Sequence, residues 1–472
     1  MILALLTAVA GFAPQQSVPI SRTQPSSVVQ TNRSSQRAAL GRLLRTGRGS
    51  TGLTLGGNFT TGRSAPKARV SATSAPGVFR IQLDDPGTGW QESVLLGVPT
   101  VQSTQATPLL VMFHAYDVSE WDCFVHGYDT FEGARSRGWY VLAPLGAHQV
   151  NFGIAYSQTN IEYALSLFTD LLPIDPNRIY GAGFSMGGGA MMSYASRHHD
   201  PAKPRFAAVT NHTGGVSVAL NYWNSPNTSV FDHPLMFGGS PSQFPFKYSQ
   251  ASAADIDAST LQVDSMTSLS ANLSHVTVIS HYAQNDPRAF LVAATQAIHD
   301  WLQLIPGMGA SLWSTPENIH HWSTLDEDAA LTAMGNVTLR IPREGVHDAL
   351  ADREAWWFHF YVYQDTPDAF TPFRWDMNAQ ANRLVIDRTQ NLKRLVVNTQ
   401  SIGLNPSVNM EITMGATDGS TEIVTLSGYA SKPQQVLRGG VPESHWSWDA
   451  GTKTLTLTEA NPAARAVWKI RP

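Results

Sequence analysis

A serine in a glycine-rich turn is the residue in this sequence best placed for nucleophilic chemistry. Ser185 stands at the centre of residues 183–187, which read G-x-S-x-G, after an apolar stretch at 178–182 and before a small-residue helical stretch that begins near Met186. A serine at the tip of a sharp strand-to-helix turn has an exposed hydroxyl, and the flanking glycines let strand and helix pass without a Cβ clash. The helix N-terminus behind it offers free N–H groups to a developing oxyanion. The pattern therefore predicts that Ser185 is a nucleophile.

Other glycine-rich motifs fit this turn poorly. A dinucleotide fingerprint needs G-x-G-x-x-G, but counting from Gly181 the last position is Met186. A phosphate-binding loop needs a lysine before Ser or Thr, and none stands there. The histidines also lack H-E-x-x-H or a comparable metal-ligand spacing. We therefore predict no cofactor and no metal.

The stretch 175–188, which reads DPNRIYGAGFSMGG, resembles the nucleophile elbow of the α/β-hydrolases. It is most similar to the polyhydroxybutyrate-depolymerase and feruloyl-esterase-like branch, and to the related prolyl-oligopeptidase-like branch. The resemblance covers roughly residues 107–362. It implies a serine hydrolase acting through a triad whose members follow one another along the chain as Ser, Asp or Glu, and His.

The acid of such a triad is expected after the strand that follows a large insertion. Residues 281–287 read HYAQNDP and resemble the family loop H-G-x-x-D-P, which implies that Asp286 is the acid. Tyr282 and one extra residue depart from that pattern. Asp300 is a poor substitute, because its predicted helical position points it away from the strand ends.

The base is expected after the last strand of the sheet. Residues 345–348 (GVHD) follow a predicted strand at 336–341 and match the histidine loop of the family, which implies that His347 is the base. His320 and His321 precede that strand, and His359 falls inside a predicted helix. We interpret these three histidines as structural or surface residues.

The oxyanion needs two N–H donors. The resemblance implies that one is the backbone of Met186 and that the other comes from the loop after residues 109–113, hence from Ala115 or Tyr116. Relatives usually read His-Gly at this loop, whereas this chain has His114-Ala115-Tyr116. The Tyr116 hydroxyl is a further candidate donor.

Strands that alternate with helices predict an α/β fold with a doubly wound, mostly parallel sheet. Continuous apolar runs suit strands that are buried on both faces of such a sheet, and the helices between them show a period of 3.6 residues. The predicted strands lie at 78–83, 108–113, 139–144, 178–182, 206–210, 275–280 and 336–341, and the predicted helices at 160–172, 289–304 and 353–361.

Composition and rhythm divide the chain further. Residues 1–75 are predicted to be a signal-like apolar start (1–12) and a disordered basic leader, and 76–366 a catalytic domain with insertions at 211–274 and 306–335. Residues 367–472 contain short strands between turn signals and are predicted to form a β-sandwich. Trp446 and Trp448 in that sandwich are interpreted as core residues, with sugar or polymer binding as the alternative.

Composition excludes several function classes. A chain of 472 residues with a net charge of −4 shows no sign of a nucleic-acid partner, and no stretch is long and apolar enough to span a membrane. The only cysteine, Cys123, is predicted to be a buried bystander. The apolar start predicts a secreted or periplasmic protein, and nothing in the sequence sets the oligomeric state.

The sequence thus predicts a carboxylic ester hydrolase that acts on a small or polymeric ester through an acyl-enzyme. Two alternatives stay open. One is a peptidase of the prolyl-oligopeptidase type with the same triad, although the tract before residue 107 is too short and too polar for the usual propeller. The other is a non-catalytic binding module on a hydrolase fold.

Overall fold

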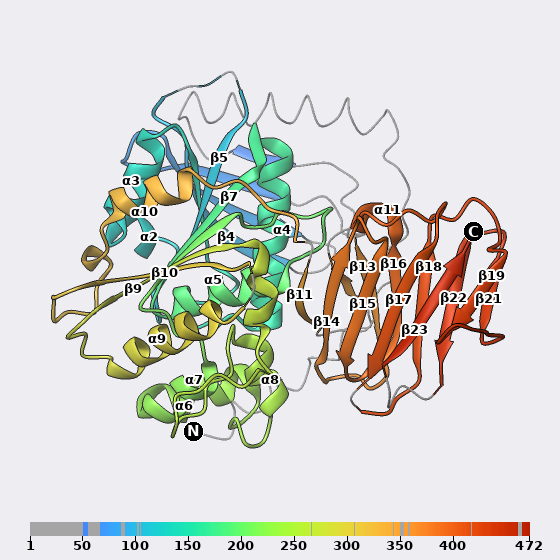
Figure 1. Cartoon of the computed structure of the whole chain (residues 1–472). Coiled ribbons are helices and arrows are strands. Elements are labelled where there is room, and N and C mark those ends of the chain that lie inside the picture. Colours follow the sequence, from blue (N-terminus) through green and yellow to red (C-terminus); the bar gives the residue numbers. More distant parts are fainter. Residues whose placement is uncertain are drawn as a thin grey trace.

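The structure is a computed structural model, and it shows two folded parts that lie side by side (Figure 1). It describes residues 51–54, 67–85, 90–101, 103, 105–265, 267–305, 307–342, 344–349, 354–356, 359–416, 418–460 and 465–472. The signal-like start at 1–12 and most of the basic leader lie outside the described residues.

The first part is built on a large sheet. Within the described residues it has ten strands in the order β1-β2-β3-β4-β6-β5-β7-β8-β9-β10. The strands are β1 (Thr51–Thr54), β2 (Lys67–Ala72), β3 (Val78–Asp85), β4 (Trp90–Gly97), β5 (Thr107–Phe113), β6 (Tyr140–Pro144), β7 (Ile174–Phe184), β8 (Ala208–His212), β9 (Thr277–Ala283) and β10 (Gly309–Thr315). From β6 to β10 all neighbours are parallel, while β1 to β4 are antiparallel to their neighbours. This confirms the predicted doubly wound, mostly parallel sheet.

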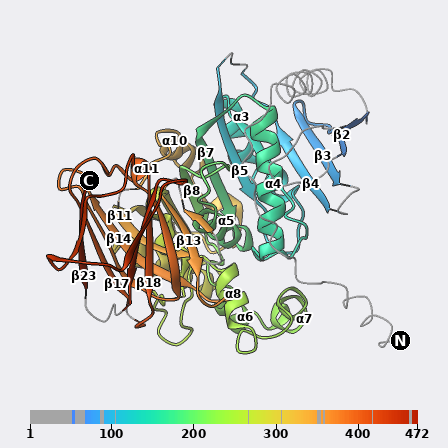
Figure 2. The ribbon, with the colours of Figure 1, turned by 90° about the vertical axis from the view of Figure 1, so that its right-hand side faces the viewer.

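Helices cover both faces of this sheet (Figure 2). The helices are α2 (Asp122–Val125), α3 (Tyr128–Ser136), α4 (Ala155–Leu171), α5 (Met186–Arg197), α9 (Ala289–Gln303) and α10 (Glu327–Gly335). Buried residues of α4, α5 and α9 belong to the core on one face, and those of α2, α3 and α10 to the core on the other face. Cys123 is fully buried in the second core, as predicted.

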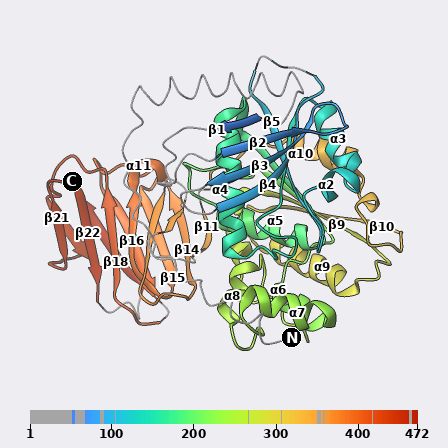
Figure 3. The ribbon, with the colours of Figure 1, turned by 180° about the vertical axis from the view of Figure 1, so that it is seen from behind.

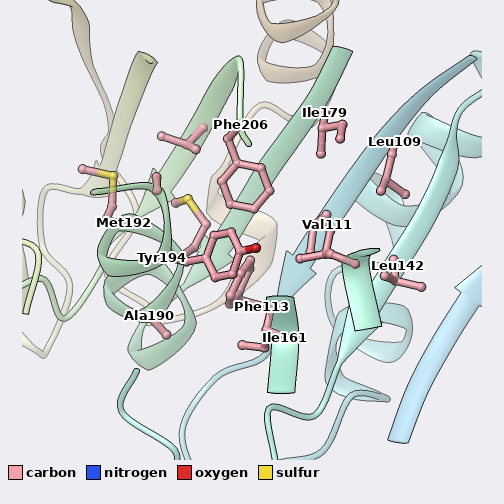
Figure 4. Close-up of a cluster of buried hydrophobic side chains, with 14 of the residues drawn as sticks. Leu109, Val111, Phe113, Leu142, Ile161, Ile179, Ala190, Met192, Tyr194 and Phe206 are labelled. Carbon is pink, nitrogen blue, oxygen red and sulfur yellow. The ribbon is translucent and has the colours of Figure 1, made fainter. Parts of the chain in front are cut away.

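Strand β5 shows why the chain folds this way. All seven of its residues are buried. Leu109, Val111 and Phe113 pack into the core beneath α4 and α5 (Figure 4), whereas Leu110 and Met112 pack into the opposite core. Successive side chains of a strand point to opposite faces of the sheet. A continuous apolar run such as β5 therefore supplies the cores on both faces.

The insertion between β8 and β9 forms a helical cap. It contains α6 (Val218–Asn224), α7 (Pro226–Phe237), α8 (Pro245–Ala251) and the 3₁₀ helix η1 (Leu269–His275), and in Figure 1 the helices α6 to α8 gather at one end of the sheet. Ser217 caps α6 by accepting a hydrogen bond from the Leu220 N–H. The predicted insertion at 211–274 therefore has its own helical structure.

The second part consists of two packed sheets (Figure 3). In the described chain, seven strands form one sheet: β11 (Glu344–Ala349), β14 (Thr371–Asn378), β15 (Arg383–Thr389), β17 (Met410–Ala416), β23 (Ala466–Arg471), β19 (Gln435–Arg438) and β20 (Val441–Pro442). Six form the other: β12 (Glu354–Trp356), β13 (Phe360–Gln364), β16 (Leu392–Asn398), β18 (Glu422–Ser427), β22 (Thr454–Glu459) and β21 (Trp446–Asp449), with the short helix α11 (Thr399–Ile402) after β16.

The predicted β-sandwich thus encloses its own core. Trp446 and Trp448 are partly buried and pack against this core, in agreement with the interpretation of both as core residues. Phe246 of α8 and Phe370 of the sandwich meet with ring centroids 5.3 Å apart, so the cap also touches the second part.

The prediction of a disordered leader up to residue 75 is wrong for β1 and β2. Strand β2 pairs antiparallel with β3 along its whole length, and Val70 is buried in the core. Its sequence, KARVSA, carries too few apolar residues to indicate a strand. Strand β2 lies between β1 and β3, and backbone pairing with both neighbours supplies the order that its few apolar residues do not indicate.

Two further element predictions are wrong in the middle of the chain. Residues 306–335 were expected to be an insertion, but they contain β10, which pairs parallel with β9. Residues 336–341 are predicted to be a strand, but Asn336 ends α10 in a helical conformation and residues 337–341 have no regular secondary structure. Strand β10 reads GASLWST and is half-buried, so it lacks the apolar run by which the other parallel strands were found.

The strand pairings also contradict the predicted helix at 353–361 and the predicted domain boundary at residue 366. Residues 354–356 and 360–364 form β12 and β13, which pair with each other and, through β13, with β16. Strand β11 pairs with β14. Phe360 and Val362 are buried while Tyr361 is half-buried, a period of two that tertiary pairing turns into a strand.

Candidate active site

Ser185 sits in a strained turn between β7 and α5. Its backbone angles are φ 57° and ψ −122°, a conformation that L-residues rarely adopt. A Cβ on Gly183 would lie 2.3 Å from the Gly187 carbonyl oxygen, and a Cβ on Gly187 would lie 2.2 Å from the Phe113 carbonyl oxygen. Both positions therefore require glycine, and the tight crossing predicted from the sequence is present.

Ser185 is the first member of a hydrogen-bonded line of three side chains. Its Oγ lies 2.9 Å from Nε2 of His320, and Nδ1 of the same ring lies 2.7 Å from Oδ2 of Asp286. The Asp286 side chain is almost completely buried, whereas that of His320 is 17% exposed. With Nδ1–H donating to the carboxylate, Nε2 is free to accept the proton of the serine hydroxyl.

Asp286 lies in the loop after β9, where the sequence placed the acid. Its second oxygen, Oδ1, accepts the backbone N–H of Arg288 at 2.7 Å, so both carboxylate oxygens are held. Asp300, the rejected substitute, lies in α9 with a side chain that is 78% exposed and is bonded to His299. The structure thus brings Asp286, and not Asp300, to the histidine that bonds Ser185.

The histidine predicted as the base is not the one that contacts Ser185. The backbone of His347 lies in β11, opposite Phe373 of β14 in the sandwich, whereas His320 forms the bonds to Ser185 and Asp286. The difference follows from the missed strand, because the loop that carries His320 comes directly after β10 rather than after residues 336–341. His320 stands five residues beyond Thr315, the last residue of β10. A histidine this soon after a strand of the sheet is the sequence signal that could have indicated His320.

Aromatic rings hold His320 in place. The Phe184 ring, next to Ser185 in the chain, lies 4.5 Å from the His320 ring and 5.5 Å from the Trp322 ring. Behind them, His212 and His281 meet edge to face at 4.8 Å. Burial holds the pKa of His212 well below its usual range and lowers the pKa of His281 to about 4, so both rings are neutral near pH 7.

The predicted oxyanion donors are only partly available. The N–H of Ala115 donates to Oδ2 of Asp122 at 3.1 Å, which corrects its prediction as a donor to substrate. The Tyr116 hydroxyl donates to Oδ2 of Asp232 in α7, so it is engaged as well. Burial first, and then the bond and charge of Asp232, raise the pKa of Tyr116, so the hydroxyl keeps its proton.

The backbone N–H groups of Tyr116 and Met186 remain as candidate donors. Among the described residues neither N–H has a hydrogen-bond acceptor. Met186 is the first residue of α5, where backbone N–H groups have no partner within the helix. These two groups come from the two places, the elbow and the β5 loop, that the fold assigns to an oxyanion hole.

The cap packs directly on this side of the site. Met186 is buried in a cluster with Phe152, Phe237 and Tyr248, and the partly buried Tyr116 packs against the same cluster. The insertion at 211–274 therefore touches both proposed donor residues. It is not an excursion remote from the nucleophile.

Two features of the described residues bear on other functions. No group of three or more His, Cys, Asp or Glu side chains in that part of the chain has the arrangement of a metal site. The helices it contains are all too short or too polar to cross a membrane.

Comparisons with known proteins give distant likenesses. No protein-family model matches the chain, and no curated protein matches it. A ferulic acid esterase is 16% identical over 54% of this chain and 95% of that chain, with a TM-score of 0.39. An S-formylglutathione hydrolase from Agrobacterium tumefaciens is 14% identical over 56% and 96%, with a TM-score of 0.38. Acetyl xylan esterase 1 from Thermoanaerobacterium sp. JW/SL YS485 is 13% identical over 66% and 98%, with a TM-score of 0.38.

The first part of the chain has the α/β-hydrolase fold. Its strand order, its elbow between β7 and α5, and the loops after β5, β9 and β10 carry this conclusion.

Proposed function

We propose that the chain is a serine hydrolase that cleaves carboxylic esters, with Ser185 as nucleophile, His320 as general base and acid, and Asp286 as the group that orients His320. The observation that carries the proposal is the continuous line of hydrogen bonds from Ser185 through His320 to Asp286 at the carboxyl ends of the strands. A serine hydroxyl is a weak nucleophile unless a base takes its proton, and the line supplies that base.

The chemistry follows from the positions of these groups. His320 Nε2 takes the proton of the Ser185 hydroxyl as Oγ attacks the ester carbonyl, and Asp286 stabilises the imidazolium that forms. The N–H groups of Met186 and Tyr116 would hold the oxyanion of the tetrahedral intermediate. The intermediate collapses when His320 gives the proton to the departing alcohol, which leaves an acyl group on Ser185. Water then attacks the acyl-enzyme with His320 again as base, and the carboxylic acid is released.

The test is turnover of short and medium p-nitrophenyl esters beside aminoacyl and prolyl p-nitroanilides, by the wild type and Ser185→Ala. Ester hydrolysis that disappears in Ser185→Ala is the expected result. Dominant anilide cleavage would make the protein a peptidase instead. Absence of turnover and of labelling by a fluorophosphonate would overturn the hydrolase proposal and favour the binding module.

Secretion is proposed separately, from the apolar residues 1–12 alone. Expression of the full chain with and without these residues, followed by fractionation, tests it. Export that is independent of residues 1–12 would contradict it.

A further inference from the structure

A buried carboxylate outside the line of Ser185, His320 and Asp286 joins two loops of the site. Asp122 is the first residue of α2, and its side chain is 5% exposed. Its Oδ2 accepts the backbone N–H of Ala115 at 3.1 Å and the indole Nε1–H of Trp322 at 3.0 Å. Its Oδ1 lies 2.8 Å from Nδ1 of His126. One carboxylate thus contacts the end of its own helix and two other segments of the chain, those of Ala115 and Trp322.

Two of these segments hold groups of the proposed reaction. Ala115 immediately precedes Tyr116, whose N–H is a proposed oxyanion donor, and Trp322 follows the base His320 by two residues. The Phe184 ring contacts both the His320 and the Trp322 rings and leads directly into Ser185. A displacement of Trp322 would therefore shift the Phe184 ring, and with it the position of His320 and of the segment that carries Ser185.

The bonding at Asp122 suits a positioning role better than a simple packing role. A buried carboxylate is costly unless donors satisfy it, and charge-assisted hydrogen bonds are shorter and stronger than neutral ones. Because one oxygen accepts from both Ala115 and Trp322, it fixes the separation of the two loops. Ala115 has no side chain beyond Cβ with which to fix its own position.

We propose that Asp122 is a positioning residue of this active site, which holds the oxyanion loop at Ala115 and the base loop at Trp322 in register with each other. This inference rests on the proposed function. Asp122 would touch neither substrate nor the reacting atoms, and it would act on the reaction only through the placement of Tyr116 and His320.

The test compares Asp122→Ala and Asp122→Asn in the full chain by kcat and KM on p-nitrophenyl butyrate. Misplacement of catalytic groups by about 1 Å costs on the order of 100-fold, so Asp122→Ala is expected to lower kcat by about 30- to 100-fold with KM changed by less than about threefold. Asn keeps one oxygen that can accept both N–H groups, so Asp122→Asn is expected to recover kcat to within about fivefold of the wild type.

Trp322→Phe isolates one of the two bonds. It removes the indole donor while keeping an aromatic ring against Phe184, so a fall in kcat of about three- to tenfold is expected. In the Asp122→Ala background the same substitution should have little further effect, because the bond is already gone. Full additivity of the two losses would overturn the link through Trp322.

A matched control is Asp387→Ala in the sandwich. Asp387 is also a buried carboxylate, and it accepts two bonds from the Arg374 guanidinium. This variant is expected to lower the melting temperature while its kcat stays within twofold of the wild type.

The results separate the two proposals. An active wild type whose Asp122→Ala variant has unchanged kcat, or whose Asp122→Asn variant is as slow as the Ala variant, would overturn the positioning role and leave the hydrolase intact. A loss of kcat in Asp387→Ala equal to that in Asp122→Ala would show that destabilisation alone accounts for the effect and would also overturn it. A folded wild type that turns over no ester would overturn both proposals.

Discussion

Two stretches build the candidate site, and they differ in how much of their geometry is local. Residues 174–197 form β7, the turn at Ser185 and α5 from one continuous segment, and the close contacts between Gly183 and Gly187 lie within it. Residues 309–320 form β10 and the His320 loop, but β10 is a strand only because β9 lies beside it. The first stretch is specified by its own residues, whereas the second takes its shape from a neighbour.

The difference explains where inference from sequence is reliable. A nucleophile elbow needs special backbone angles, and only particular residues in a fixed order allow them. A half-buried edge strand and the loop after it can be made from many sequences, because pairing with the sheet supplies the order. Substitutions in the two stretches should therefore behave differently, which the glycine comparison below tests. Three further comparisons test the residues that the fold brings to or beside the candidate site.

The largest effect is expected when the two candidate bases, His320 and His347, are each replaced by alanine. His320→Ala should lower kcat/KM by at least about 10⁴-fold, because the proton of Ser185 then has no acceptor. His347→Ala should stay within about threefold of the wild type. Steady-state ester hydrolysis measures both. The reverse outcome would restore the base predicted from sequence and would mean that His320 does not serve Ser185 in solution.

Replacing Asp286, the proposed acid, is expected to give the next largest effect. Asp286→Asn should lower kcat by about 10³-fold, because an amide no longer stabilises the imidazolium of His320 and favours the wrong tautomer. Asp300→Asn is the matched control in the following helix, and it should leave kcat within twofold of the wild type. If Asp286→Asn retained full activity, another group would have to orient the base.

Glycine-to-alanine changes compare the two stretches directly. In Gly183→Ala the new Cβ would meet the carbonyl oxygen and carbon of Gly187 at 2.3 and 2.6 Å, so a loss of about 4 kcal/mol in the free energy of unfolding is expected. In Gly309→Ala of β10 the nearest atom would be Thr277 Oγ1 at 3.4 Å, an ordinary contact.

Gly309→Ala is therefore expected to change the free energy of unfolding by less than about 0.5 kcal/mol. Urea denaturation of the two variants is the measurement. Equal destabilisation of the two variants would show that the backbone of β10 is as tightly constrained as that of the elbow. That result would contradict the difference inferred between the two stretches.

The smallest effect is a pH dependence at the β9–β10 edge. His281 is buried next to Thr315, and its pKa is lowered from 6.5 to about 4 by burial. A lowered pKa means that the unfolded chain binds the proton more readily. The stability that neutral His281 contributes is therefore present above pH 6.5 and is lost as the pH falls toward 4.

Replacing His281 by Gln should reduce the loss of unfolding free energy between pH 7 and pH 4, by at most about 3 kcal/mol. Melting temperatures of the wild type and His281→Gln across that range test the assignment. Two parallel profiles would show that His281 does not contribute to acid destabilisation.

Much of the catalytic part could be predicted from the sequence and from its resemblance to a known family. Apolar runs located β5, β6, β8 and β9, and the elbow motif located Ser185 and Met186. The HYAQNDP stretch located Asp286, despite the changes from the family loop. These signals work because a strand buried on both faces must be apolar along its length, and because a strained turn tolerates few residue types.

The errors share one physical cause. Strand β10 is half-buried, β2 has few apolar residues, and β12 and β13 carry aromatics that also fit one face of a helix. In each case backbone pairing with a distant strand decided the structure. Missing β10 displaced the expected last strand to 336–341, and that displacement moved the predicted base to His347, away from the histidine that bonds Ser185.

The sequence by itself determined the turn that carries Ser185, the parallel sheet and the presence of a second, all-β part, because each rests on local geometry or on burial of continuous apolar runs. It indicated Asp286, the proposed acid, only through the resemblance of residues 281–287 to a family loop. Only the tertiary structure decided which histidine bonds Ser185 and that Ala115 is held by Asp122. It also decided that the hydroxyl of Tyr116 is engaged by the cap. Those outcomes depend on contacts between segments up to about two hundred residues apart, such as Asp122 with Trp322, and no local pattern encodes them.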